Sequence, residues 1–98
     1  MRSFRDQTEI AVEVGETFEV VLGGNFTTGY RWALTERPDA ISLVSDEMRA
    51  RGAAPGSAGT QHFRLAAESG GRFSLVFSYR RPWEDASSDE RRIDVHVE

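Results

Sequence analysis

The chain contains no cysteine among its 98 residues. It can therefore form no disulfide framework, no thiolate metal site and no thiol nucleophile, so its stability must come from core packing. Its apolar runs are also short, and none approaches the ~20 residues that cross a bilayer as a helix. We expect no membrane-spanning helix and no association with a membrane.

A clustered basic face is missing as well. The formal net charge is −4, and the twelve basic residues, all arginine, are mixed along the chain with sixteen acidic ones. Nucleic-acid binding requires a concentrated positive surface, because the phosphate backbone provides most of the affinity. Nucleic acid is therefore not an expected partner.

The length corresponds to one compact domain, and we expect a single domain over residues 1–98, with residues 1–7 flexible. The amino terminus has no apolar stretch after its basic residues, so no secretory signal is expected in this chain. That predicts a cytoplasmic protein, or a periplasmic or secreted one if a leader precedes it. No exposed apolar stripe suggests a dimer, and a monomer is expected.

Alternation of apolar and polar residues with a period of two is the main local signal. It predicts strands at 8–14, 17–22, 30–34, 41–48, 60–67, 73–79 and 93–97. The stretch 46–54 is compatible with a helix, but it lacks a sustained apolar face and ends in Gly and Pro. The fold class is therefore all-β, an immunoglobulin-like β-sandwich of about seven strands with Greek-key connections. Trp32 is expected in its core.

Three connecting segments have compositions that a simple turn does not require. They are Asn25-Phe26-Thr27-Thr28-Gly29-Tyr30, Gly56-Ser57-Ala58-Gly59-Thr60 and Arg80-Arg81-Pro82-Trp83-Glu84. In a seven-strand Greek-key sandwich the loops after the second, fourth and sixth strands gather at one end. We expect these three loops to form one continuous surface.

These segments carry a family resemblance. The stretch 25–30 resembles the Asn-Pro-Thr-Thr-Gly-aromatic loop of chagasin-like inhibitors, 59–63 resembles their Gly-rich loop with its following strand, and 81–84 contains their Arg-Pro-Trp motif. All three occur in the family's order. One short motif would be weak evidence, but three in register are specific. The resemblance spans nearly the whole chain.

The resemblance implies a reversible inhibitor of papain-family cysteine peptidases, with no enzymatic activity and no cofactor. The implied peptidase-binding residues are Asn25, Phe26, Thr27, Thr28, Gly29, Tyr30, Gly56, Ser57, Ala58, Gly59, Thr60, Arg81, Pro82, Trp83 and Glu84. By position, Thr27 and Thr28 come nearest the catalytic groups, with Gly29 allowing close backbone approach. Trp83 lies on an aromatic surface of the enzyme, and residues 56–60 offer backbone hydrogen bonds.

Two positions depart from the family pattern. Phe26 replaces proline and so removes a fixed φ angle, and restoring the proline is expected to strengthen inhibition if loop order limits affinity. Ala58 replaces a favoured glycine, which would be strained at a positive φ.

Other interpretations stay open at this stage. An immunoglobulin-like adhesion or scaffold module could use the same loops on a non-protease partner. Thr27 and Thr28 could be ordinary turn residues bonded to the local backbone, and Trp83 could cap the core. Asn25 begins a glycosylation sequon. His62 and His96 are expected to be half-exposed strand residues without a metal role, and Ser57 lacks the strand-turn-helix context of a catalytic serine.

Overall fold

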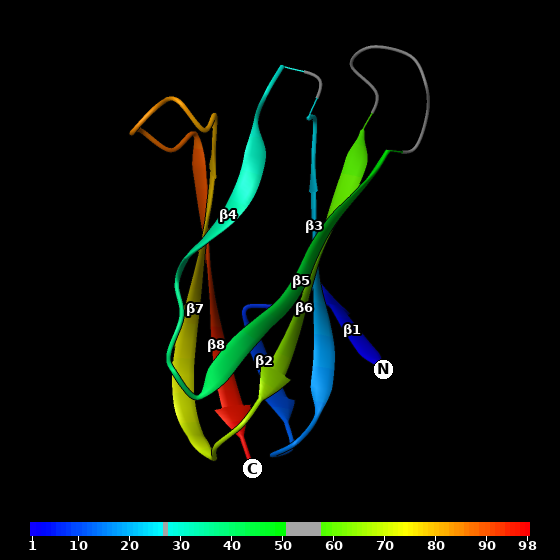
Figure 1. Ribbon diagram of the computed structural model, residues 1–98, viewed down its shortest axis with the longest axis vertical. Coiled ribbons are helices and arrows are strands. Elements are labelled where there is room, and N and C mark those ends of the chain that lie inside the picture. Colours follow the sequence, from blue (N-terminus) through cyan, green and yellow to red (C-terminus); the bar gives the residue numbers. More distant parts are fainter. Residues whose placement is uncertain (27, 51–57) are drawn as a thin grey trace.

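The computed structural model describes residues 1–26, 28–50 and 58–98, which form eight strands in two four-stranded sheets (Figure 1). The strands are β1 (Arg2–Arg5), β2 (Glu9–Val12), β3 (Thr17–Gly24), β4 (Arg31–Glu36), β5 (Ile41–Ala50), β6 (Gly59–Ala67), β7 (Gly71–Arg80) and β8 (Asp89–Val97). Within these ranges no segment is a helix able to span a bilayer.

Sheet A has the strand order β1-β3-β6-β5 and sheet B the order β2-β8-β7-β4. Two of the antiparallel pairs, β5–β6 and β7–β8, are consecutive in sequence, whereas the connections from β3 to β4, β4 to β5 and β6 to β7 cross between the sheets. This arrangement confirms the predicted immunoglobulin-like sandwich. The seven predicted strands correspond to β2–β8.

Within residues 1–7, for which flexibility was expected, residues 2–5 form the strand β1. Arg2–Arg5 pairs in parallel with β3, and the Phe4 ring meets Phe18 edge-on with ring centres 6.1 Å apart. The Arg2 guanidinium also donates to both carboxylate oxygens of Glu16 at 2.7 Å. A stretch with one apolar residue gives no alternation, so the pattern could not reveal this strand.

The core lies between the two sheets, where the alternating apolar side chains of each sheet meet. Its buried members are Ile10, Val12, Phe18, Val20, Leu22, Trp32, Ile41, Phe63, Leu65, Ala67, Leu75, Phe77, Ile93, Val95 and Val97. Trp32 is 3% exposed, as predicted for a core residue. Its indole N–H donates to the Gly23 carbonyl at 3.1 Å, which satisfies the ring's polar atom.

Gln61 is a polar residue buried completely within this core. Its side-chain oxygen accepts from the Trp32 backbone N–H, and its amide group donates to the Trp32 carbonyl, both at 2.8 Å. The same amide donates to Asp46 Oδ1 at 2.8 Å. Because Gln61 and Trp32 belong to different sheets, this side chain ties the sandwich together just below the end of β3 and the start of β6.

On the outer face of sheet A, His62 is buried, which corrects the prediction of half exposure. It is 6% exposed, and its Nδ1 lies 3.1 Å from the carboxylate of Glu19, which is 8% exposed. The other ring nitrogen lies 2.8 Å from the Thr60 hydroxyl, while Ser3 donates to Glu19 at 3.0 Å. Hydrogen bonds thus satisfy the polar groups of this buried network.

Candidate functional site

Strand register brings the described residues of the three predicted loops to one pole of the sandwich. In sheet A, Gly59 pairs with both Gly24 and Ala50, so the connection from β3 and both ends of the β5–β6 connection lie at this pole. In sheet B, Arg31 pairs with Arg80, which places the start of β4 beside the end of β7. Figure 1 shows the β3–β4 and β7–β8 connections side by side at this end, with the carboxyl terminus at the other. We call residues 25, 26, 28–30, 58–60 and 81–84 the tip.

Tyr79 joins the two sheets beneath the tip. Its hydroxyl donates to the Asn25 carbonyl at 2.6 Å and accepts from the Asn25 backbone N–H at 3.1 Å. Its ring stacks on Tyr30 at a centre distance of 5.2 Å and packs against Trp32 at 5.0 Å. Both ends of the first loop are therefore fixed by one side chain of β7.

The first loop closes in a turn in which the Gly29 N–H donates to the Phe26 carbonyl at 3.3 Å. Thr28 is exposed in this turn, and its hydroxyl makes no hydrogen bond with the described residues. The interpretation of Thr28 as a turn residue held by local backbone bonds is therefore not supported. Thr27 lies outside the described residues.

Phe26 is half-buried and packs onto the edge of the core. Its ring meets Tyr79 edge-on at 6.4 Å. A methyl group added at Gly24 or Gly59 would come within 2.9 Å or 3.3 Å of this ring. Phe26 thus fills the space between the first loop and the start of β6, and it anchors the loop from below.

Gly29 accommodates the Trp83 ring. Its φ angle is +91°, and a Cβ at this position would lie 2.7 Å from the end of the Trp83 indole. In the structure, therefore, the group that comes close to Gly29 is the Trp83 ring of the same chain. Trp83 itself is 70% exposed, which excludes the alternative that it caps the core.

Arg81 links the first loop to the third. Its guanidinium carbon lies 4.6 Å from the centre of the Tyr30 ring and 6.0 Å from that of Trp83. Its Nη1 bonds to Glu84 at 3.0 Å, whereas the buried Nε has no acceptor among the described residues. Cation–π contact and one ion pair hold this side chain in place. Pro82, beside it, is exposed.

The second loop is described only at its carboxyl end, since Gly56 and Ser57 lie outside the described residues. Ala58 is exposed, and it is not among the described residues with positive φ, so it carries no strain of the kind considered above. Gly59 is required, because a Cβ there would lie 2.9 Å from the Arg49 carbonyl oxygen. Thr60 is half-buried beside His62.

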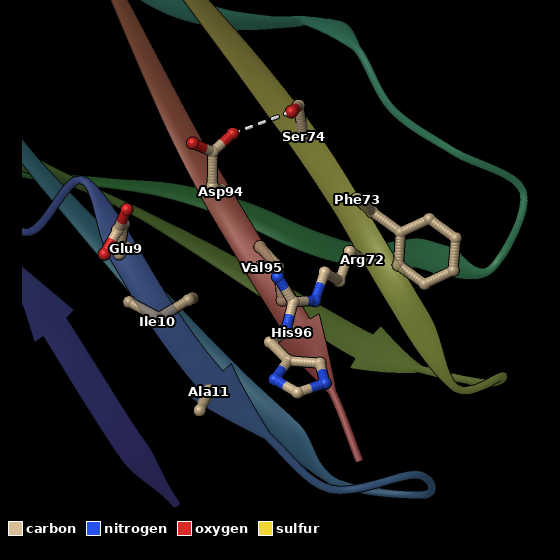
Figure 2. A pocket seen from close by; sticks show the side chains of 9 residues that line it. All are labelled: Glu9, Ile10, Ala11, Arg72, Phe73, Ser74, Asp94, Val95 and His96. Atoms are coloured by element: carbon tan, nitrogen blue, oxygen red, sulfur yellow. Dashed lines mark hydrogen bonds between the residues drawn. The ribbon is translucent and has the colours of Figure 1, made fainter.

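Sequence reasoning missed the role of Tyr79. An aromatic residue at the end of an alternating strand looks like one more core position, and the pattern gives no sign that its hydroxyl spans both sheets. The described residues hold no group of three side chains suited to a metal ion. A hollow of about 570 Å³ lies over β2, β7 and β8, lined by Arg72, Asp94 and His96 among others (Figure 2), and no tip residue contributes to it.

Comparison with known proteins connects this geometry to a family. The model of the chagasin family of peptidase inhibitors matches residues 11–97. The chain belongs to this family. It is 30% identical over 94 residues to chagasin of Trypanosoma cruzi, covering 90% of this chain and 86% of chagasin. It is 32% identical over 87 residues to amoebiasin-1 of Entamoeba histolytica, covering 86% and 83% of the two chains.

Solved structures of similar fold agree with the family assignment. A cysteine protease inhibitor from Entamoeba histolytica superposes with a TM-score of 0.82 at 19% identity, over 99% of this chain and 95% of that one. PbICP-C, solved in complex with falcipain-2, gives a TM-score of 0.73 at 21% identity over 100% of both chains. In this chagasin-family chain the three predicted motifs therefore stand on the fold that the family uses.

Proposed function

We propose that this chagasin-family protein is a reversible inhibitor of papain-family cysteine peptidases and that its tip occupies the active-site cleft. The observation that carries the proposal is the contact of the first and third loops, in which Trp83 covers Gly29 and Arg81 stacks on Tyr30. These contacts make a single rigid wedge from two separated segments. The fold relative PbICP-C was solved with a peptidase, falcipain-2, as its partner.

Inhibition of this kind requires no chemistry from the inhibitor. A wedge that fills the groove without presenting a peptide carbonyl at attack distance blocks substrate and is not cleaved. In the proposed complex Thr27 and the exposed Thr28 enter beside the catalytic cysteine, with Asn25 and Phe26 supporting Thr28 from below. The chain is therefore not expected to act as an enzyme.

The flanking segments of the tip grip the enzyme on either side. On one side the indole of Trp83 supplies a large exposed apolar face, with Pro82 and Glu84 next to it. On the other side the described residues 58–60 offer backbone groups to the extended-chain groove, a role that the family resemblance extends to Gly56 and Ser57. An aromatic residue of this kind is typical of the few positions that dominate binding energy.

Preorganisation favours tight binding. The tip is fixed by the Tyr79 hydroxyl, the Phe26 ring and the Arg81 stack before any enzyme arrives, so docking costs little loop entropy. An interface of roughly 800 Å² on each partner is sufficient for a specific, stable complex.

The test is titration of the protein into papain, or a related peptidase, with a fluorogenic peptide substrate. We expect stoichiometric loss of activity that returns on dilution, with the inhibitor chain recovered uncut. An absence of inhibition at micromolar concentration contradicts the proposal. That result would instead favour an immunoglobulin-like adhesion or scaffold module that uses the same tip on a non-protease partner.

A further inference from the structure

Two arginines face each other on the outer surface of sheet B, directly below the tip. Arg31 and Arg80 are cross-strand partners in the last ladder pair of β4 and β7. Trp32 and Tyr79, the next residues inward on each strand, pack into or against the core, so the two arginines point to the opposite face. Arg31 is exposed and Arg80 half-buried.

This pairing is unfavourable for folding. Like charges directly opposite one another in an antiparallel pair destabilise a sheet. Neither Arg31 nor Arg80 forms an ion pair or a side-chain hydrogen bond within the described part of the chain. By contrast, ion pairs are formed by Arg2, Arg49, Arg81, Arg91 and Arg92.

The acidic residue next along this face does not neutralise the pair. Glu90 of β8 lies opposite Ser78, two residues along β7 from Arg80, and forms no ion pair with either arginine. Packing inside the described chain therefore gives no reason for two guanidinium groups at this ladder position.

The position of the pair suggests its purpose. Arg31 directly follows Tyr30 of the first loop, and Arg80 directly precedes Arg81 of the third. These two neighbours form the stack that holds the tip together. A protein seated on the tip would therefore lie immediately beside Arg31 and Arg80.

We propose that Arg31 and Arg80 form an electrostatic docking site for carboxylates on the rim of the target peptidase's cleft. This inference rests on the proposed function. A guanidinium binds a carboxylate through paired, charge-assisted hydrogen bonds. A carboxylate placed between the two arginines would also remove their mutual repulsion. This relief of repulsion stabilises the complex and is absent from the free protein.

Because the whole chain is negative, the Arg31–Arg80 pair has a strong influence on how an acidic enzyme is oriented as it approaches. With a formal net charge of −4, the protein as a whole repels an acidic partner. A local positive pair directly below the tip then steers the approaching enzyme toward the wedge and away from other faces. Charges at an interface rim act mainly on the association rate, and salt screens that effect.

Arg72 provides a matched control. It lies on the same outer face of sheet B at the other end of β7, opposite His96, where it lines the hollow of Figure 2. Like Arg31 it is exposed, and like both arginines of the pair it forms no ion pair within the described residues. Replacing it changes the net charge by the same amount as replacing one arginine of the pair.

The experiment compares wild type, Arg31→Gln, Arg80→Gln, the double variant and Arg72→Gln. Association rates are measured with two papain-family peptidases, one with an acidic cleft rim and one with a neutral rim, at salt from about 20 mM to about 0.5 M. With the acidic enzyme at low salt we expect the double variant to associate about threefold to tenfold more slowly. This difference in association rate between wild type and the double variant should disappear at high salt, and it should be absent with the neutral enzyme.

Stability separates a docking role from a structural one. We expect the thermal midpoint of the double variant to equal or exceed that of wild type, because a repulsive pair is removed. Equal association rates for wild type and double variant, an equal loss in Arg72→Gln, or a midpoint that falls together with affinity would each overturn the inference. If wild type fails to inhibit at all, the proposed function itself is wrong.

Discussion

The guanidinium of Arg81 lies 4.6 Å from the centre of the Tyr30 ring, and Tyr30 in turn stacks on Tyr79 at 5.2 Å. A cation from the third loop thus rests on an aromatic pair formed by the first loop and β7. The stack fixes the separation of the two loops, which is the geometry that a wedge needs.

Replacing Arg81 with Gln should weaken inhibition about tenfold, because a partly buried cation–π contact contributes about 1–2 kcal/mol. Arg81→Lys should be nearly as weak, since an ammonium lacks the flat face that stacks on Tyr30. Inhibition constants against papain provide the measurement, with Arg72→Gln as control. Full activity in Arg81→Lys would mean that charge alone matters at this position.

Trp83→Ala should weaken inhibition by ~2 kcal/mol or more, as truncation of an interfacial aromatic anchor often does. The side chain is 70% exposed, so its loss should leave the thermal midpoint nearly unchanged. Titration against the same peptidase tests the predicted loss of inhibition, and a melting curve tests the predicted thermal midpoint. Val14→Ala, an exposed apolar position near the opposite pole, should alter neither value. An unchanged inhibition constant in Trp83→Ala would remove this residue from the interface.

Gly29→Ala should impair inhibition largely by displacing Trp83. The new Cβ would lie 2.7 Å from the indole, and the φ of +91° adds a penalty of about 1 kcal/mol for any side chain. A double-mutant cycle is the informative measurement. In the Trp83→Ala background, Gly29→Ala should cost clearly less affinity than in wild type. Additive losses would show that Gly29 acts independently of Trp83.

Alternation predicted the sandwich well because the core positions of seven strands obey it. It failed where a polar residue is buried by a tertiary partner. Gln61 satisfies its amide on Trp32 and Asp46, and His62 and Glu19 satisfy one another, yet both partnerships join strands far apart in sequence. A local pattern records polarity and spacing, and it carries no information about such partners.

The same limit applies to the tip. The resemblance named the loop residues, and strand topology placed the described ones at one pole, but their side-chain directions came from packing. Phe26 turns toward Gly24 and Gly59, and Gly29 receives Trp83, so part of the expected contact set supports the tip from within. Thr27, Gly56 and Ser57 remain predictions, because they lie outside the described residues.

Phe26→Pro should weaken inhibition and lower the thermal midpoint, which reverses the expectation drawn from the family's proline. The ring of Phe26 fills the space beside Gly24, Gly59 and Tyr79, and proline would leave a cavity there. We expect a loss of about 1–3 kcal/mol in unfolding free energy, which exceeds the entropy that proline recovers. Phe26→Leu, which keeps an apolar filler, should lose less. Stronger inhibition by Phe26→Pro would show that loop order outweighs this packing.

The buried carboxylate of Glu19 should make stability depend on acid pH. Burial has the largest single effect on the pKa of Glu19 and raises it, because it opposes ionisation. Hydrogen bonds from His62 and Ser3 and the charges of His62 and Arg49 act the other way, and together they lower the pKa of Glu19 below its ordinary 4.5. A group whose pKa is depressed by folding contributes stability above its unfolded pKa and loses it as the pH falls through the folded value.

Wild type should therefore melt above Glu19→Gln at neutral pH, and this advantage should shrink as the pH drops below about 4.5. Thermal midpoints of both proteins, measured from neutral pH to about pH 3, test whether the advantage is lost in this pH range. Glu47→Gln is the control, because its ion pair with Arg49 is exposed and exposed pairs contribute little. A constant gap between wild type and Glu19→Gln across the acid range would show that Glu19 stabilises the sheet by shape and hydrogen bonding rather than by its charge.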